Sequence, residues 1–333
     1  MTDRTPLDGV DLLLADLDGV VYTGPDAIPY AVESLNRAAA GRRVGYLTNN
    51  ASRTAASVAD HLTSLGLSVR PEDVVTSPQA AVRLLAGLVP AGALVLVVGG
   101  DGLVSEVVKA GFRVTRSADD LPAAVIQGFA PEIGWTDLAE ASFALHTGIP
   151  WVATNTDWTI PVARGIAPGN GTLVAAVHNA VGRLPVVAGK PEVALYEEAV
   201  SRFGGSTPLF IGDRLDTDIL GANRAGIDSV LVLTGIDHAK QVLAAEPNSR
   251  PTYILEDLRG LDLPYPSTEE HAAGEARLFA VGGAVVRLEG NRVSIDATGD
   301  GGIDLLRAGA AAVWGAGVAI YGLEVAPELY VEG

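Results

Sequence analysis

Short runs of apolar residues alternate along most of the chain with stretches in which apolar positions recur every three to four residues. The first pattern indicates buried strands and the second indicates amphipathic helices. Continuous apolar strands spaced by helices are typical of parallel sheets covered on both faces. The expected strands are Leu12–Ala15, Val44–Thr48, Leu94–Val98, Ala123–Gly128, Trp151–Asn155, Leu209–Gly212 and Val230–Leu233. The expected helices are Thr54–Leu65, which Gly66 ends, Pro78–Ala86, Gly102–Ala110, Thr136–Thr147, Thr172–Val181, Pro191–Phe203 and Thr217–Ala225.

The order of these elements predicts an insertion. A nearly complete α/β unit lies between about Gln79 and Ala188, within a sheet that starts at Leu12 and resumes at Leu209. We therefore expect a core of residues 1–78 and 189–262 and an inserted domain of residues 79–188.

A second boundary is expected at Leu261–Glu270, a segment rich in Pro, Ser and Glu that predicts a linker. Beyond it, Arg277–Val286 and Val293–Ala297 are expected strands, and Ile303–Trp314 is an expected helix. Residues 268–333 would then form a small C-terminal module of unknown role. The expected fold is α/β, with a Rossmann-like parallel-sheet core, an inserted α/β cap domain and a small α+β C-terminal appendage.

Composition and charge exclude several classes of partner and site. The chain has 333 residues, 48% of them hydrophobic, and a net charge of -17. Such an acidic surface opposes binding to nucleic acid or to anionic lipid, so neither partner is expected. The chain contains no cysteine, which removes disulfides, thiolate zinc sites and cysteine nucleophiles.

The expected location is the cytoplasm. Met1 to Gly9 contains two acidic residues and no apolar core, so we expect no signal peptide. No apolar run approaches the ~18 residues of a membrane span. The absence of cysteine is compatible with a reducing compartment.

Two carboxylates directly follow the first expected strand. Asp16 and Asp18 stand just past its C-terminal end, where open parallel sheets bind ligands. Strand alternation predicts both side chains on the same face. Taken alone, the sequence also fits a solvated turn that Gly19 ends.

Two further strand ends carry polar residues. Thr48, Asn49 and Asn50 precede a helix, and their hydroxyl, amides and backbone N–H groups form a composition that suits a phosphate. Lys190, between Gly189 and Pro191, is one of only three lysines in the chain. An ordinary helix cap and a surface lysine are the alternatives.

The sequence Gly212–Ile219 is the strongest signal. Asp213, Asp216 and Asp218 place three carboxylates within six residues at a strand end. Asp216 could serve only as a helix N-cap. Acids this close repel one another unless a cation neutralises them, and a hard, oxygen-liganded ion such as Mg²⁺ fits. If these residues did not form a site, four separate structural explanations, one at each strand end, would all have to hold at once.

The joint pattern resembles the haloacid dehalogenase superfamily of phosphatases, and within it the branch with a large α/β cap. That branch includes 4-nitrophenylphosphatases, phosphoglycolate phosphatases and glycerol-3-phosphate phosphatases. With its tail, the arrangement is most similar to bacterial glycerol-3-phosphate phosphatases. The resemblance covers about residues 10–260, and its matching segments are Asp16–Gly19, Thr48–Asn50, Pro168–Thr172, Gly189–Pro191 and Gly212–Ile219.

The resemblance implies Mg²⁺-dependent hydrolysis of small phosphate monoesters through an aspartyl-phosphate. It implies that Asp16 attacks phosphorus and that Asp18 acts as general acid and then general base. It assigns the metal to the Asp16 and Asp213 carboxylates and to the backbone carbonyl of Asp18. Asp218 would lie behind these ligands and orient bound water or the lysine.

The remaining implied roles concern the phosphoryl group. Thr48 and the backbone N–H groups of Asn49 and Asn50 would hold its oxygens. Lys190 would neutralise the charge on the nucleophile and on the phosphoryl group as negative charge spreads.

Substrate recognition is expected from the insertion, because core motifs of this kind serve many chemistries. Asn155, Asp157 and Arg164 lie on the expected loop before the helix at Thr172, where a plain polar surface loop is the alternative. Amides and acids suit a small polyol phosphate, and together with the resemblance they make glycerol 3-phosphate the favoured substrate. Phosphoglycolate comes second, because Arg164 suits a carboxylate. The expected partners are a small phosphorylated metabolite and, from the resemblance, a second copy of the chain.

Two other classes of protein stay open. Val98–Gly102 follows a strand and precedes a helix, as in nicotinamide oxidoreductases, but it lacks the G-x-G-x-x-G spacing. A scaffold that binds a metal or a partner without turnover is the other class. The intact pair Asp16 and Asp18 favours an enzyme.

Overall fold

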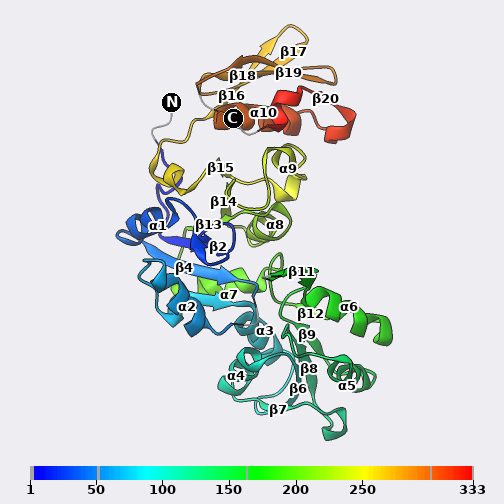
Figure 1. The fold of residues 1–333 in the computed structure, drawn as a ribbon. Coiled ribbons are helices and arrows are strands. Elements are labelled where there is room, and N and C mark those ends of the chain that lie inside the picture. Colours follow the sequence, from blue (N-terminus) through cyan, green and yellow to red (C-terminus); the bar gives the residue numbers. More distant parts are fainter. Residues whose placement is uncertain (1–3, 51–52, 163, 301, 332–333) are drawn as a thin grey trace. The chain divides into compact units, whose positions relative to one another are not determined.

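The chain forms two compact units in the computed structural model, which describes residues 4–50, 53–162, 164–300 and 302–331. The first unit comprises Met1–Val44 and Gly205–Gly333, and the second comprises Gly45–Gly204 (Figure 1). Met1 to Asp3, part of the segment in which no signal peptide is expected, lie outside the described residues. The separate inserted domain of residues 79–188 stays a prediction.

A parallel sheet forms the centre of the first unit. Its strands run in the order β15 (Tyr253–Leu255), β14 (Asp228–Val232), β13 (Pro208–Gly212) and β1 (Leu12–Ala15). All four residues of β1 are buried, as an apolar strand covered on both faces requires. Because β1 and β13 are parallel neighbours, the residues that follow them, Asp16 and Asp213, emerge at the same edge of the sheet.

Helices and a small hairpin complete this part of the first unit. They are β2 (Tyr22–Thr23), β3 (Asp26–Ala27), α1 (Ala31–Ala39), α8 (Leu220–Arg224) and α9 (Ala239–Leu243). The helix expected from Thr217 begins differently, because Leu215–Ile219 forms a π-helical turn before α8. Asp216 lies inside this turn, so the alternative that it is only an N-cap is wrong.

The C-terminal region is an antiparallel sheet with a helix on one face. Its strands are β16 (Thr268–Ala273), β17 (Ala276–Val281), β18 (Ala284–Glu289), β19 (Arg292–Thr298) and the short parallel β20 (Glu324–Val325). The single strand expected over Arg277–Val286 is wrong. Gly282, with φ of 55°, and Gly283 turn the chain there and divide it into β17 and β18. The expected linker is also shorter, because β16 starts within it.

Helix α10 (Gly302–Gly315) joins this sheet to the rest of the first unit. It lies between the sheet and α9 (Figure 1). The Trp314 indole N–H donates to the Val242 carbonyl at 3.1 Å. Phe279 and Val286 of the sheet share one apolar core with Leu243 of α9. The C-terminal module is therefore packed as part of the first unit.

The second unit contains a parallel pair of strands, β4 (Arg43–Thr48) and β5 (Val74–Thr76), and a five-stranded parallel sheet. The five strands, in spatial order, are β12 (Val186–Val187), β9 (Trp151–Ala153), β8 (Ala124–Gln127), β6 (Leu94–Val98) and β7 (Arg113–Thr115). The helices are α2 (Ala55–Ser64), α3 (Ser77–Ala86), α4 (Asp101–Lys109), α5 (Trp135–Leu145), α6 (Asn170–Val181) and α7 (Ala194–Phe203). The α/β fold expected from the sequence is confirmed.

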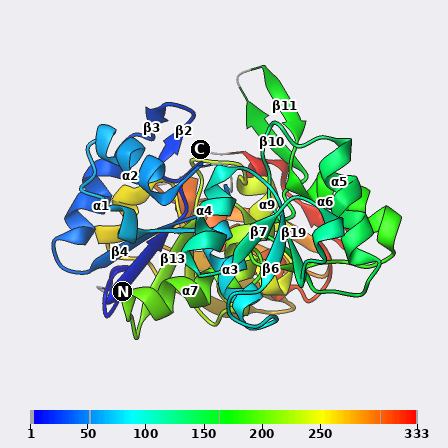
Figure 2. The same ribbon diagram turned by 90° about the horizontal axis from the view of Figure 1, so that it is seen from below.

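The segment expected to be a loop before α6 contains an antiparallel hairpin. Its strands are β10 (Thr159–Val162) and β11 (Gly165–Pro168), and the hairpin projects beside α6 (Figure 2). Pairing of Thr159 with Pro168 brings the chain back to the start of α6. In the part of the chain that the structure describes, no helix is long and apolar enough to cross a membrane.

Candidate active site

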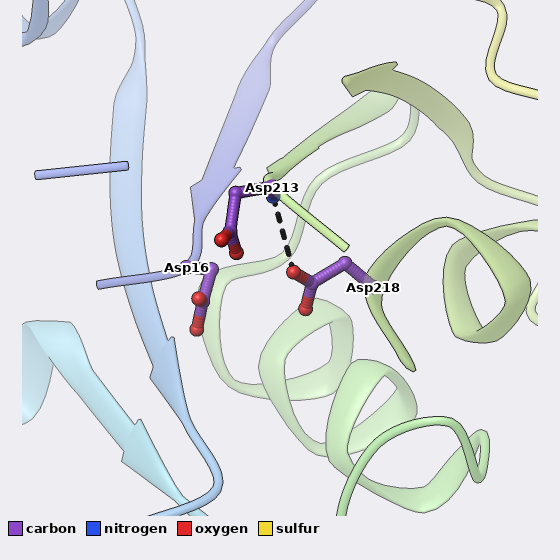
Figure 3. A group of neighbouring side chains, drawn as sticks. All are labelled: Asp16, Asp213 and Asp218. Atoms are coloured by element: carbon purple, nitrogen blue, oxygen red, sulfur yellow. Dashed lines mark hydrogen bonds between the residues drawn. The ribbon is translucent and has the colours of Figure 1, made fainter. Parts of the chain in front are cut away.

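Three buried carboxylates converge in the first unit. Asp16 follows β1, Asp213 follows β13, and Asp218 lies in the π-helical turn (Figure 3). One carboxylate oxygen from each lies within 4.8 Å of the others. Their exposed fractions are 8%, 2% and 1%. Three acidic side chains this close and this buried favour the binding of a cation, since neither water nor distance screens their charges.

The loop after β14 holds the Asp213 side chain. The backbone N–H of Ile236 donates to Asp213 Oδ2 at 2.8 Å. Two glycines, Gly19 and Gly235, closely approach this carboxylate. A Cβ added to Gly19 or to Gly235 would lie 2.5 Å from Asp213 Cγ, well inside van der Waals contact. Both glycines are therefore required by the position of this carboxylate.

The Asp218 carboxylate is fixed by its own turn. Its Oδ2 accepts the backbone N–H of Asp213 at 3.2 Å (Figure 3). The same oxygen accepts the backbone N–H of Arg214 at 3.2 Å. The π-helical turn makes this contact, because the N–H groups of Asp218 and Ile219 both donate to the Arg214 carbonyl. Asp218 was expected to orient bound water or the lysine instead of binding the metal itself. In the structure its carboxylate lies in the same group as those of Asp16 and Asp213.

Two charged residues, Arg214 and Asp237, lie in the loops next to this group of acids. Arg214 forms two hydrogen bonds with the exposed Asp216, at 3.0 and 2.8 Å, which raise the pKa of its guanidinium. Burial raises the pKa of the Asp237 carboxyl above its ordinary value. The donor set of the three buried residues consists of oxygen atoms only and carries negative charge, which fits Mg²⁺.

Asp18 differs from Asp16 in its surroundings. Its side chain is exposed, whereas that of Asp16 is buried. A turn follows, in which the N–H of Gly19 donates to the Tyr22 carbonyl at 2.9 Å. The Thr234 hydroxyl donates to the Gly19 carbonyl at 2.7 Å and ties this turn to the loop after β14. An exposed carboxylate can exchange protons with solvent, as a general acid must.

In the second unit, Asn49 holds the backbone of Lys190 from both sides. Its Oδ1 accepts the Lys190 N–H at 2.8 Å, and its Nδ2 donates to the Lys190 carbonyl at 3.1 Å. The Lys190 residue is 4% exposed. Gly189 must lack a side chain, because a Cβ there would lie 2.6 Å from Asn49 Oδ1. The expected phosphate loop and the expected lysine are therefore adjacent in this unit.

Both the nitrogen and the oxygen of the Asn155 side-chain amide form hydrogen bonds. Its Nδ2 donates to the Asn49 carbonyl at 2.8 Å, and its Oδ1 accepts the Asp157 N–H at 3.2 Å. Asp157 in turn accepts a hydrogen bond from Asn49 Nδ2 at 3.1 Å. Asn170 Nδ2 donates to the Asn155 carbonyl at 2.7 Å. Asn155 and Asp157 are thus connected to the loop that holds Lys190.

The other expected site residues in this unit are Thr48, Asn50 and Arg164. The buried Thr48 hydroxyl accepts the N–H of Asn50 at 3.0 Å. Arg164 is exposed in the turn between β10 and β11.

Sequence reasoning missed the loop Thr234–Asp237, which supplies contacts to Asp213, Gly19 and Leu215. It follows β14, the neighbour of β13 in the same parallel sheet. The rule that ligand sites form at the C-terminal ends of parallel strands applies to this strand as well. That rule, applied to every strand, would have found the loop.

Two family models match the chain. Residues 13–113 match a model described as haloacid dehalogenase-like hydrolase, and residues 187–261 match a second, HAD-hydrolase-like model. Together with the close relatives described next, these matches show that the chain belongs to the haloacid dehalogenase-like hydrolases. Family membership favours the hydrolase prediction over the nicotinamide oxidoreductase alternative.

The relatives within this family are phosphatases. The chain is 46% identical to a D-glycerol 3-phosphate phosphatase of Mycobacterium tuberculosis over 91% of this chain and 86% of the relative. It is 33% identical to an acid sugar phosphatase of Staphylococcus aureus, over 74% of this chain and 94% of the relative.

Solved structures agree with these relatives. A magnesium complex of a glycerol phosphate phosphatase from M. tuberculosis superposes with a TM-score of 0.82 at 44% identity, covering 95% of this chain and 94% of the other. A p-nitrophenyl phosphatase from Archaeoglobus fulgidus gives a TM-score of 0.70 at 27% identity, covering 76% and 98%. The expectation of a phosphatase, as opposed to a scaffold without turnover, is confirmed.

Proposed function

We propose that this chain hydrolyses small phosphate monoesters with Mg²⁺ through a phosphorylated Asp16, and that its substrate is glycerol 3-phosphate. The group of three buried carboxylates, Asp16, Asp213 and Asp218, carries the reaction part of this proposal. The 46% identity to a relative named as a D-glycerol 3-phosphate phosphatase supports the substrate. Phosphoglycolate is the second candidate, because the exposed Arg164 suits a carboxylate.

The reaction takes place in two steps. An oxygen of the Asp16 carboxylate attacks phosphorus, the ester P–O bond breaks, and Asp18 gives its proton to the departing alkoxide. The products of this step are the alcohol and an aspartyl-phosphate. Asp18 then takes a proton from water, which attacks phosphorus, releases inorganic phosphate and restores the Asp16 carboxylate.

Mg²⁺ would be held by the Asp16 and Asp213 carboxylates and by the backbone carbonyl of Asp18. Asp218, in the same group of carboxylates, either binds the ion or orients its water. The ion supplies positive charge that offsets the repulsion between a carboxylate and a phosphate dianion. Thr48, Asn49, Asn50 and Lys190 are proposed to hold the phosphoryl oxygens. The two hydrogen bonds between the Asn49 side chain and the Lys190 backbone support their acting together.

Removal of the metal tests this function. Treatment with a chelator, followed by dialysis, is expected to abolish hydrolysis of glycerol 3-phosphate and of 4-nitrophenyl phosphate, because the Asp16 carboxylate must then approach a dianion without a cation. Added Mg²⁺ is expected to restore both rates. Full activity in metal-free buffer would contradict the proposal.

Substrate recognition is proposed for Asn155, Asp157 and Arg164. The contacts of Asn155 with Asn49 and with the Asp157 backbone favour a supporting role for its amide. Arg164 has an exposed side chain on the hairpin and is the better candidate for direct contact with the substrate.

Arg164→Ala tests that contact. We expect KM for the natural ester to rise about tenfold, since one unpaired polar contact costs about 1–3 kcal/mol. The rate with 4-nitrophenyl phosphate is expected to stay within about twofold. Arg113→Ala, at an exposed position of β7 in the same unit, is the matched control. Equal losses with both esters would assign Arg164 a structural role and would exclude it from specificity.

We further propose that the protein is a homodimer in the cytoplasm. Exposed aromatic side chains of α5, Trp135 at 79% and Phe143 at 59%, support an interface between copies. The lack of cysteine supports a reducing compartment. Light scattering should give twice the mass of the 34.2 kDa chain, and a monomer would exclude the dimer. Cell fractionation tests the location, and recovery outside the cytoplasmic fraction would exclude it.

A further inference from the structure

We propose that Asp237 is a positioning residue for the carboxylates that hold the metal, a role that rests on the phosphatase function proposed above. Asp237 lies in the loop after β14 and is half-buried. Its Oδ2 accepts the backbone N–H of Leu215 at 2.6 Å. Its own backbone N–H donates to the Asp213 carbonyl at 3.1 Å. One residue thus joins two loops at two points.

These contacts hold Asp213 within a closed pair of loops. The N–H of Ile236, the residue before Asp237, donates to Asp213 Oδ2 at 2.8 Å. Three hydrogen bonds therefore connect the segment 213–215 to the segment 235–237, and one of them ends on the carboxylate itself. If the contact between Asp237 and Leu215 were lost, two of these three hydrogen bonds would remain, both of them to Asp213.

Asp237 acts on the metal only through other residues. Within the described residues, the group of carboxylates that could hold an ion consists of Asp16, Asp213 and Asp218. The Asp237 side chain instead holds the start of the π-helical turn, Leu215–Ile219, which contains Asp218. π-Helical turns often occur at functional sites. In this turn, the hydrogen bond of the Leu215 N–H must be kept for the Asp218 carboxylate to keep its position.

Two substitutions separate the hydrogen bond from the charge. Asp237→Ala removes the acceptor for the Leu215 N–H. Asp237→Asn keeps an acceptor oxygen of the same reach and removes only the charge. Asp216→Asn is the matched control, because it removes a charge from the same turn, where the Asp216 carboxylate pairs with the Arg214 side chain.

The experiment measures 4-nitrophenyl phosphate hydrolysis by the full chain as a function of Mg²⁺ concentration. For Asp237→Ala we expect the half-saturating Mg²⁺ concentration to rise about 10- to 100-fold, as is typical when a partner behind the metal ligands is lost. The kcat at saturating Mg²⁺ should fall less than about threefold. Asp237→Asn and Asp216→Asn should both stay within about threefold of the unmodified chain in Mg²⁺ requirement.

A second readout does not depend on turnover. The rise in Tm that Mg²⁺ produces should need correspondingly more Mg²⁺ in Asp237→Ala than in the unmodified chain. If Asp237→Ala did not fold, Asp237→Ser, whose hydroxyl is too short to reach Leu215, would replace it. An unchanged Mg²⁺ requirement in the alanine variant, or an equal rise in the asparagine variant, would overturn the proposal. If the unmodified chain showed no Mg²⁺-dependent turnover, the proposed function would fail, and the Tm titration would still decide the role of Asp237.

Discussion

Asp16→Asn is expected to lower kcat for phosphate esters by about 10⁴–10⁶-fold, the range seen when one residue of a hydrolase's catalytic triad is removed. The amide cannot form the aspartyl-phosphate, and it takes one negative charge from a group that also includes Asp213 and Asp218. Acid quenching during turnover of ³²P-labelled substrate measures directly whether the aspartyl-phosphate forms. Labelled phosphate should remain on the unmodified protein and should be absent from the variant.

Asp216→Asn is the control for this experiment. It makes the same chemical change in the same unit, on an exposed carboxylate that pairs with Arg214. Its turnover and its trapped phosphate should match those of the unmodified chain. Covalent phosphate on the Asp16→Asn variant would assign the nucleophile to another residue.

The parts of the site that the sequence predicted are those that follow continuous apolar strands. Leu12–Ala15 and Leu94–Val98 have the expected bounds, because buried parallel strands need no polar alternation. The position of Asp16 next to Asp213 then follows from the pairing of β1 with β13. The type of residue at each strand end, together with parallel pairing, was enough to predict an acidic group.

The geometry behind the strand ends could not be predicted. The place of Asp218 depends on a π-helical turn, in which two N–H groups share the Arg214 carbonyl, and no periodic pattern in the sequence indicates such a turn. The role of Asp237 likewise depends on the approach of two loops that are 22 residues apart. Contacts of this kind arise from tertiary packing of irregular backbone.

Short strands and glycine turns limited the prediction elsewhere. Arg277–Val286 has the residue types of a single strand, and only the turn at Gly282 and Gly283 divides it. The hairpin of β10 and β11 was expected to be loop, and each of its strands has only four residues and contains a proline, Pro161 or Pro168. For Asn155 the residue type suggested substrate contact, and the structure uses its amide to connect Asn49 with Asp157.

Gly235→Ala is expected to lower kcat/KM by about 10²-fold, although it adds only one methyl group. The new Cβ would lie 2.5 Å from Asp213 Cγ, so the carboxylate or the loop must move by about an ångström. A displacement of that size in a catalytic group can cost ~10²-fold in rate. The variant should also need more Mg²⁺, because Asp213 is proposed to bind the ion and its Oδ2 accepts the Ile236 N–H beside the substitution.

Gly41→Ala provides the matched control, because nothing lies within 4 Å of an added Cβ there. It makes the same change in the same unit and should leave kcat/KM within about twofold. Thermal unfolding of both variants should show that each is folded at the assay temperature. If folded Gly235→Ala kept the full rate and the original Mg²⁺ requirement, then the position of Asp213 would not matter to the reaction, and its assignment as a metal ligand would have to be withdrawn. A loss of activity in Gly235→Ala and not in Gly41→Ala would instead show that catalysis depends on the position of the Asp213 carboxylate. The new methyl group contacts that carboxylate at position 235 and contacts nothing at position 41.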